Sequence, residues 1–219
     1  MLESLAPAGS PDMLSISDQV YAHIKKLILA GTLRGGERIP EKKVADLFKV
    51  SRTPVREAIR KLAEYGLVVI KPRSYAFVAT ISPEEARDIS WVRLYLEKLS
   101  CRLFCGAGAQ AEASLPQLRE VSRRCKEANE YGDFATAHEH DSALHLEIAR
   151  RTGNRELLEM LSMLDAKLQL LRLKQHLPRP ELSKYFAQHD LLLTLLEQKD
   201  LAKVDALLDL HILHDLNFK

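Results

Sequence analysis

Four residues in the C-terminal part of the chain carry side chains that suit a metal site. Asp141 and His145 are four positions apart in a segment with helical periodicity, so they share one face of a helix. His189 and His211 lie among leucines in the middle of two further predicted helices. Three imidazoles and one carboxylate from three helices suit a divalent transition metal in the core of a bundle. The alternative is a set of hydrogen-bonded core histidines, the more common role of a single histidine in an apolar helix.

A second group of chemically specific residues lies on a basic helix predicted from Ser51 to Gly66. The hydroxyl of Ser51 is expected to cap its first turn, and Gly66 to end it in a left-handed conformation. One face carries an apolar stripe formed by Val55, Ile59 and Leu62. The opposite face carries Arg52, Arg56, Arg60 and Lys61. Arginine forks at the start of such a helix suit guanine O6 and N7 in a DNA major groove; the alternative is a solvated basic surface.

Two shorter helices and a hairpin must position this basic helix. One helix is predicted from Ser17 to Gly31, and a short one over 41–48 with Val44 and Leu47 facing inward. Two β-rich runs around a basic turn follow within 67–79. Helix, short helix, basic helix and hairpin form the pattern of a winged helix-turn-helix.

Beyond residue 81 the strand signals end and a helical bundle is predicted. Ser82-Pro83-Glu84-Glu85 is a capping box with proline at the first helical position. The helix that follows is expected to bury the stripe Ile89, Val92, Leu96, Leu99 and Leu103. Five more helices are predicted over 115–130, 133–151, 155–175, 181–198 and 201–217. The fold class is therefore mostly α, with an N-terminal winged helix-turn-helix and a C-terminal antiparallel α-helical bundle.

The net charge of +2 conceals a strong asymmetry along the chain. Residues 17–81 hold thirteen Lys/Arg and six Asp/Glu, whereas residues 82–219 hold nineteen and twenty-two. A basic N-terminal third is the electrostatic pattern expected of a nucleic-acid-binding module. We expect no signal peptide, because the first fifteen residues have no basic start and no long apolar core, and no apolar run reaches the ~18 residues that a membrane span needs. Three cysteines without zinc-finger spacing favour a reduced cytoplasm: Cys101, Cys105 and Cys125. Cys101 and Cys105 share a helical face and are interpreted as small core residues.

The segment GERIPEKKVADLFKVSRTPVREAIRKLAEYGLV resembles the N-terminal domain of the GntR family of bacterial transcription regulators. The resemblance covers about residues 17–80 and implies binding of a palindromic DNA operator by a homodimer. It implies that Arg52 and Arg56 read bases, that Lys42 contacts the site, and that Ser51 and Thr53 touch phosphate. The family's wing usually turns on glycine, which is absent here, although Arg73 in that turn could still reach the minor groove.

The bundle resembles the ligand-sensing domain of the FadR-type branch of this family. The similar segments are WVRLYLEKLSCRLF, DSALHLEIARRTGN, QHDLLLTLLEQKDLAKV and LLDLHILHD. Many members of the branch hold a metal, and the pattern falls here on Asp141, His145, His189 and His211, with zinc, nickel and manganese all open. The resemblance also places Arg93 in the cavity, where it would bind a small carboxylate effector; the alternative is a helix ion pair with Glu97.

The expected function is a ligand-controlled transcription regulator, with repression relieved by the effector as the expected sign. Residues 1–15 would form a flexible tail, 16–81 the DNA-binding domain and 82–219 the sensing domain. One alternative is a metalloenzyme that activates water, although no companion general acid or base has a diagnostic spacing. A further alternative is an interaction module in which the metal is purely structural.

Overall fold

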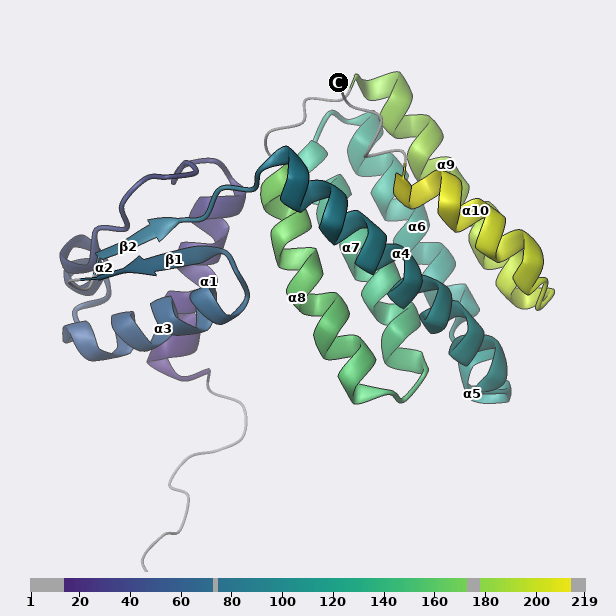
Figure 1. Cartoon of the computed structure of the whole chain (residues 1–219), viewed down its shortest axis with the longest axis horizontal. Coiled ribbons are helices and arrows are strands. Elements are labelled where there is room, and N and C mark those ends of the chain that lie inside the picture. Colours follow the sequence, from purple (N-terminus) through teal and green to yellow (C-terminus); the bar gives the residue numbers. More distant parts are fainter. Residues whose placement is uncertain (1–13, 73–74, 173–177, 214–219) are drawn as a thin grey trace, which may run out of the picture.

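The computed structural model describes residues 14–72, 75–172 and 178–213 and is mostly helical. The N-terminal part contains α1 (Ile16–Leu29), α2 (Glu41–Phe48), α3 (Arg52–Glu64), β1 (Val68–Lys71) and β2 (Tyr75–Val78). The C-terminal part contains α4 (Pro83–Gly106), α5 (Ala109–Glu112), α6 (Leu115–Glu130), α7 (Phe134–Arg151), α8 (Arg155–Arg172), α9 (Arg179–Glu197) and α10 (Leu201–Leu213). Figure 1 shows the two parts next to each other, joined where the chain leaves β2 and enters α4. The predicted fold class is confirmed.

The N-terminal domain is built around the apolar faces of α1 and α3. Val20 and Ile24 of α1 and Val55 and Leu62 of α3 are fully buried in one hydrophobic cluster. The strands β1 and β2 pair antiparallel and close this core as a hairpin. The predicted stripe on the basic helix therefore packs inward, which turns the opposite, arginine-bearing face to solvent.

The expectation that Leu47 faces inward is wrong. Its side chain is 63% exposed, whereas Val44 and Ala45 are buried and Phe48 is partly buried. The core side of α2 therefore follows positions i, i+1 and i+4 from Val44, and Leu47 lies on the flank. In a helix of eight residues, two apolar positions are too few to predict which face is turned toward the core.

The expectation that the hydroxyl of Ser51 caps the first turn of α3 is also wrong. Ser51 occupies the N-cap position of α3 with extended backbone, but its side chain makes no capping hydrogen bond. A capping hydroxyl bonds the backbone N–H of the second or third helical residue, and the third residue here is Pro54, which has no N–H. The hydroxyl of Ser51 is consequently exposed and available to another partner.

The bundle starts as predicted and its helices pack mainly against their neighbours. Ser82 and Glu85 form the reciprocal capping box at the start of α4. Helix α4 contacts α7, α8 and α10, while α6 contacts α7 and α9. The short α5 was not expected from the sequence. The ends predicted for α8 and α10, at 175 and 217, fall outside the described residues.

The apolar stripe predicted to be buried on α4 is mostly exposed. Ile89 is buried and Leu96 is partly buried, but Val92, Leu99 and Leu103 face solvent. The inward face of α4 mixes apolar side chains, including Leu94 and Phe104, with four buried polar ones: Ser90, Arg93, Glu97 and Ser100. Part of the bundle interior next to α4 is therefore polar, which a hydrophobic pattern cannot reveal.

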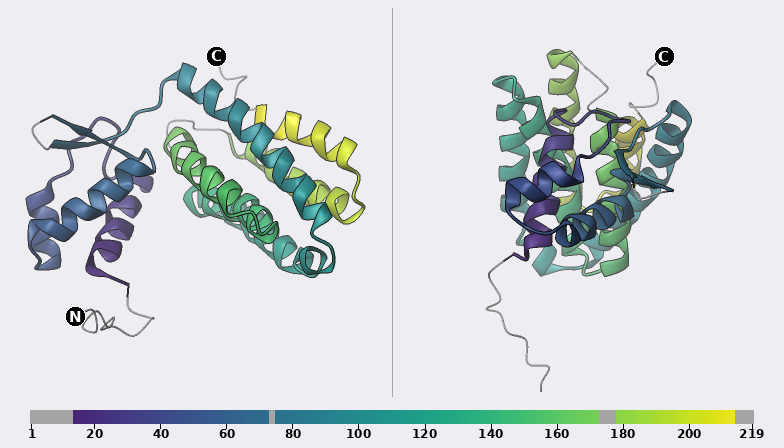
Figure 2. Two further views of the ribbon diagram at one scale, coloured as in Figure 1. Left: turned by 60° about the horizontal axis from the view of Figure 1, so that its bottom comes forward. Right: turned by 90° about the vertical axis from the view of Figure 1, so that its left-hand side faces the viewer.

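Helix α8 lies between the bundle core and the N-terminal domain. Figure 1 and the left view of Figure 2 both place α8 on the side of the bundle that faces this domain. Leu168, Leu170 and Leu171 of α8 belong to the same hydrophobic cluster as the core of the N-terminal domain. The side chain of Lys167 on α8 lies over Gly66, where a Cβ would come 2.7 Å from Cε of this lysine. Within the described ranges, every helix is too short or too polar to cross a membrane.

Candidate functional site

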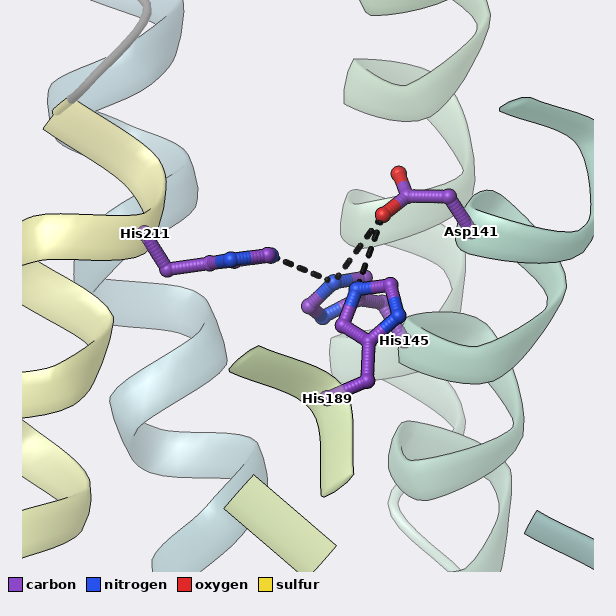
Figure 3. Close-up of side chains that lie close together, drawn as sticks. All are labelled: Asp141, His145, His189 and His211. Carbon is purple, nitrogen blue, oxygen red and sulfur yellow. Dashed lines mark hydrogen bonds and ion pairs between the residues drawn. The ribbon is translucent and has the colours of Figure 1, made fainter. Parts of the chain in front are cut away.

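The structure brings together the four residues predicted as metal ligands. Asp141 and His145 project from adjacent turns of α7, His189 from α9 and His211 from α10 (Figure 3). One potential ligand atom of each residue lies within 4.8 Å of all the others. All four side chains are buried, with Asp141 and His189 completely inaccessible. We call this group the His–Asp cluster.

Short distances connect the members of the His–Asp cluster. His145 Nε2 lies 3.2 Å from His211 Nε2, and Asp141 Oδ1 lies 3.0 Å from His189 Nε2 and 3.7 Å from His145 Nε2. Neither ring nitrogen of His189 makes a well-oriented hydrogen bond to any residue in the described part of the chain. Burial lowers the pKa of His189, and burial together with the neighbouring imidazoles lowers that of His211, so both are neutral at pH 7.

Contacts on the far side of two histidines determine which nitrogen carries the proton. The carboxylate of Glu97 contacts His145 Nδ1, and Gln188 Oε1 lies 2.8 Å from His211 Nδ1. Both oxygens accept hydrogen bonds, so a proton on each Nδ1 atom leaves the Nε2 atoms directed at each other. The two Nε2 atoms lie 3.2 Å apart, a distance that either a shared proton or a cation close to both nitrogens satisfies.

The donor set of the His–Asp cluster therefore fits a divalent transition metal. Three imidazole nitrogens and one carboxylate oxygen are ligands that zinc, nickel and manganese all accept. A histidine that binds a metal commonly donates its other N–H to a carboxylate or an amide oxygen, and oxygens of these two kinds lie next to Nδ1 of His145 and of His211.

Three residues that support the cluster were missed by reasoning from the sequence. Glu97 holds His145, Gln188 holds His211, and Arg172 at the end of α8 donates to Asp141 Oδ2. Burial alone would raise the pKa of Asp141, but the guanidinium of Arg172 holds it well below its usual value. A single arginine between leucines in the segment LQLLRL was the one available sequence signal.

Arg93 is buried and forms the ion pair that was the alternative to an effector-binding role. Its Nε donates to Glu97 Oε1 over 2.6 Å. Burial would raise the pKa of Glu97, but Arg93 and His145 lower it to about 2, so Glu97 is ionised. Arg93, His145 and Asp165 line a cavity of about 10 Å³, room for about one water molecule. An effector would therefore need side chains or helices to move.

The residues predicted to contact DNA lie on one exposed region of the N-terminal domain. Lys42 of α2, Arg52, Thr53 and Arg56 of α3, and Ser51 just before α3 are all exposed. Arg56 Nε donates to Glu41 Oε2 over 3.1 Å, which orients the guanidinium at the surface. Arg73 lies outside the described residues. The position of α3, packed on α1 with its basic side turned outward, is that of a recognition helix.

Two family models match this chain in separate regions. The model "Bacterial regulatory proteins, gntR family" matches residues 16–78, and the model "FCD domain" matches residues 88–214. Among curated proteins, the chain is 29% identical over 143 residues to the regulator YdhC of Bacillus subtilis, covering 64% of each chain. It is 38% identical over 82 residues to the repressor RspR of Escherichia coli, covering 37% of this chain and 36% of RspR. The matched regions thus span less than two thirds of these relatives.

A solved structure of the regulator McbR from Escherichia coli is similar over nearly the whole chain. It superposes with a TM-score of 0.80 at 25% identity and covers 93% of this chain and 96% of that one. A regulator from Rhodococcus shares the fold with a TM-score of 0.77 at 19% identity.

The chain therefore belongs to the gntR family of bacterial regulatory proteins and carries a C-terminal FCD domain. The family and the names of its relatives are those of transcription regulators rather than enzymes.

Proposed function

We propose that this protein is a metal-dependent, effector-controlled transcription repressor that binds a palindromic DNA operator as a homodimer. Residues 16–81 would bind DNA and residues 82–219 would sense the effector. The observation that carries the proposal is the buried His–Asp cluster in a bundle that packs directly against a winged helix-turn-helix. One relative, RspR of Escherichia coli, is a transcriptional repressor, which supports the sign of regulation.

Recognition of DNA would rest on the exposed start of α3. Arg52 and Arg56 are exposed and would reach base edges in a major groove, and the exposed Lys42 and Thr53 would contact the site beside them. The free hydroxyl of Ser51 is suited to accompany Thr53 at a phosphate, because it makes no capping bond to α3. The basic N-terminal third would attract DNA electrostatically.

A homodimer would have an apolar surface available on α4. Trp91, Val92, Tyr95, Leu99 and Leu103 are exposed and recur along one side of this helix. Large exposed apolar patches mark interaction surfaces, and a two-fold axis across one helix brings identical patches together. We expect the two-fold symmetry of the dimer to match the two halves of the operator.

The dimer proposal predicts that Tyr95→Glu lowers the solution mass from twice the 24.8 kDa chain mass toward a single chain. Tyr95 is 66% exposed on α4, and each new carboxylate would be buried against the partner, while the nearby Lys98 is already paired with Asp209. Light scattering after size-exclusion chromatography measures the mass. Tyr131→Glu, which changes the same residue type at an exposed turn after α6, is the control and should remain dimeric. A dimeric Tyr95→Glu protein would place the interface elsewhere.

The effector would be a small carboxylate that reaches the His–Asp cluster and Arg93 after local opening of the bundle. A divalent cation in the cluster would supply positive charge and a free coordination position for that carboxylate. Arg93 would provide a planar fork for the same group, exchanging Glu97 for the effector. Regulation requires that the effector bind the DNA-competent and DNA-incompetent forms with different affinity.

The proposal is tested with a DNA duplex that the wild-type protein itself selects from a random pool, here called the selected duplex. Affinity for this duplex is measured by fluorescence anisotropy with metal-loaded protein and a panel of small mono-, di- and hydroxycarboxylates. At least one acid is expected to weaken binding about tenfold or more, a coupling free energy of about 1.4 kcal/mol. If metal raises the melting temperature but no acid in the panel changes the DNA affinity, the role of the metal is purely structural.

A further inference from the structure

Arg172 connects the His–Asp cluster to the helix that packs on the DNA-binding domain. It is the last residue of α8 and is only 8% exposed. Its Nη2 donates to Asp141 Oδ2, and its Nη1 donates to Ser142 Oγ over 3.2 Å. A buried arginine is costly unless its charge and its donors are matched, so this position is specified by Asp141 and Ser142 on α7.

The hydrogen bond from Arg172 determines which carboxylate oxygen of Asp141 faces the histidines. Because Arg172 occupies Oδ2, the oxygen that faces His189 and His145 is Oδ1, at 3.0 and 3.7 Å from their Nε2 atoms. Without the guanidinium, the carboxylate would be free to rotate and to turn both oxygens toward the cluster. Arg172 therefore restricts Asp141 to a single ligand oxygen.

A hydrogen-bonded network extends this contact along α8. Ser142 Oγ donates to Asp165 Oδ1 over 2.5 Å, and Gln169 Nε2 donates to Asp165 Oδ2 over 2.6 Å. Asp165, Gln169 and Arg172 lie on successive turns of α8, so the polar face of this helix is held by α7 over about two turns.

The other face of the same turns contacts the DNA-binding domain. Leu170 and Leu171 belong to the hydrophobic cluster that includes the cores of α1 and α3, α8 contacts α1, and Lys167 lies over Gly66 just after α3. Figure 1 shows α8 as the bundle helix beside that domain. A change in the position of Arg172 therefore acts on residues one to five positions away that contact the DNA-binding domain.

We infer that Arg172 is a positioning residue for Asp141 in the proposed metal site, and that α8 transmits the state of this site to the DNA-binding domain. The inference rests on the proposed metal site. A cation held by Asp141 and the three histidines would draw charge from the Asp141 carboxylate, and Asp141 would then hold Arg172 less tightly at the end of α8. By thermodynamic linkage, DNA binding then changes metal affinity by the same factor.

The test compares Arg172→Met, which removes the charge, with Arg172→Lys, which keeps the charge but not the fork. Arg155→Met is the control, because Arg155 is an exposed arginine at the start of the same helix. Zinc affinity is measured by competition with a chromogenic chelator, and the ligand field by the visible spectrum of the Co²⁺-loaded protein. Affinity for the selected duplex is measured with and without zinc, and circular dichroism verifies folding.

Arg172→Met is expected to bind zinc about 10–100-fold more weakly than the wild type. Mutation of a residue that hydrogen-bonds a metal ligand commonly lowers metal affinity by such a factor. Its Co²⁺ spectrum should differ from that of the wild type, and saturating zinc should no longer change its affinity for the selected duplex. Arg172→Lys should restore part of the zinc affinity, and Arg155→Met should match the wild type.

The inference would be overturned by any one of three results for a folded Arg172→Met protein. These are a zinc affinity equal to that of the wild type, an unchanged Co²⁺ spectrum, and an effect of zinc on DNA binding equal to that in the wild type. If Arg172→Met does not fold, a Co²⁺ spectrum of Arg172→Lys identical to that of the wild type would overturn it as well. Absence of bound metal in the wild-type protein would instead overturn the proposed metal site, and the inference with it.

Discussion

Replacing His189 and His211 together with alanine is expected to reduce bound transition metal from about one ion per chain to none. Four donors within 4.8 Å of one another form one site, and a single carboxylate and imidazole do not retain a transition metal through purification. The measurement is elemental analysis of protein without a histidine tag, before and after loading with zinc, nickel or manganese. The metal found in the wild type would also identify the ion.

The double variant His23→Ala/His140→Ala is the matched control. It removes two histidines that lie outside the His–Asp cluster, one on α1 and one on α7, and it should keep the wild-type metal content. Equal metal content in both double variants would show that the metal is bound elsewhere. A wild-type protein that stays free of metal after loading would leave the histidines as core or effector-binding residues.

Arg56→Ala is expected to weaken binding of the selected duplex by about 1–3 kcal/mol, or roughly 5–150-fold, and to blur base preference at one position per half-site. Arg56 is exposed on α3 and is oriented by Glu41, so its fork is held ready for a guanine edge. Anisotropy titrations against the selected duplex and a set of single-base variants measure both effects.

Arg60→Ala changes the same residue type one turn further along α3, away from the helix start. It is expected to weaken all duplexes by a similar, smaller factor, as loss of a non-specific charge does. If Arg56→Ala keeps the wild-type order of preference among the single-base variants, Arg56 contacts the backbone and does not read bases.

The winged helix-turn-helix was predictable because its signals are local. The stripe Val55, Ile59 and Leu62 gave the buried face of α3, and the left-handed Gly66 ended the helix region. The capping box at Ser82 marked the start of α4 for the same reason. Such signals involve residues within one or two turns, whose contacts depend little on the rest of the fold.

The errors arose where a helix face was assigned without knowing its neighbours. On α4, Val92, Leu99 and Leu103 were expected in the core, yet the core side carries Arg93 and Glu97. The ion pair between these two residues and the contact of Glu97 with His145 make that side polar. Hydrophobic periodicity shows where the apolar face of a helix lies. It does not show whether the interior of the domain or a partner molecule covers that face.

The sequence by itself determined the family, the order of the elements and the identity of the four residues in the His–Asp cluster. The spacing of Asp141 and His145 already placed both on one face of α7, because a helix repeats every 3.6 residues. Only the tertiary structure decided that Arg172 and Gln188 complete the surroundings of the cluster and that α8 joins it to the DNA-binding domain. Contacts between helices depend on how the helices are rotated and shifted against each other. That arrangement is set by packing of the whole core, and no short segment of the chain encodes it.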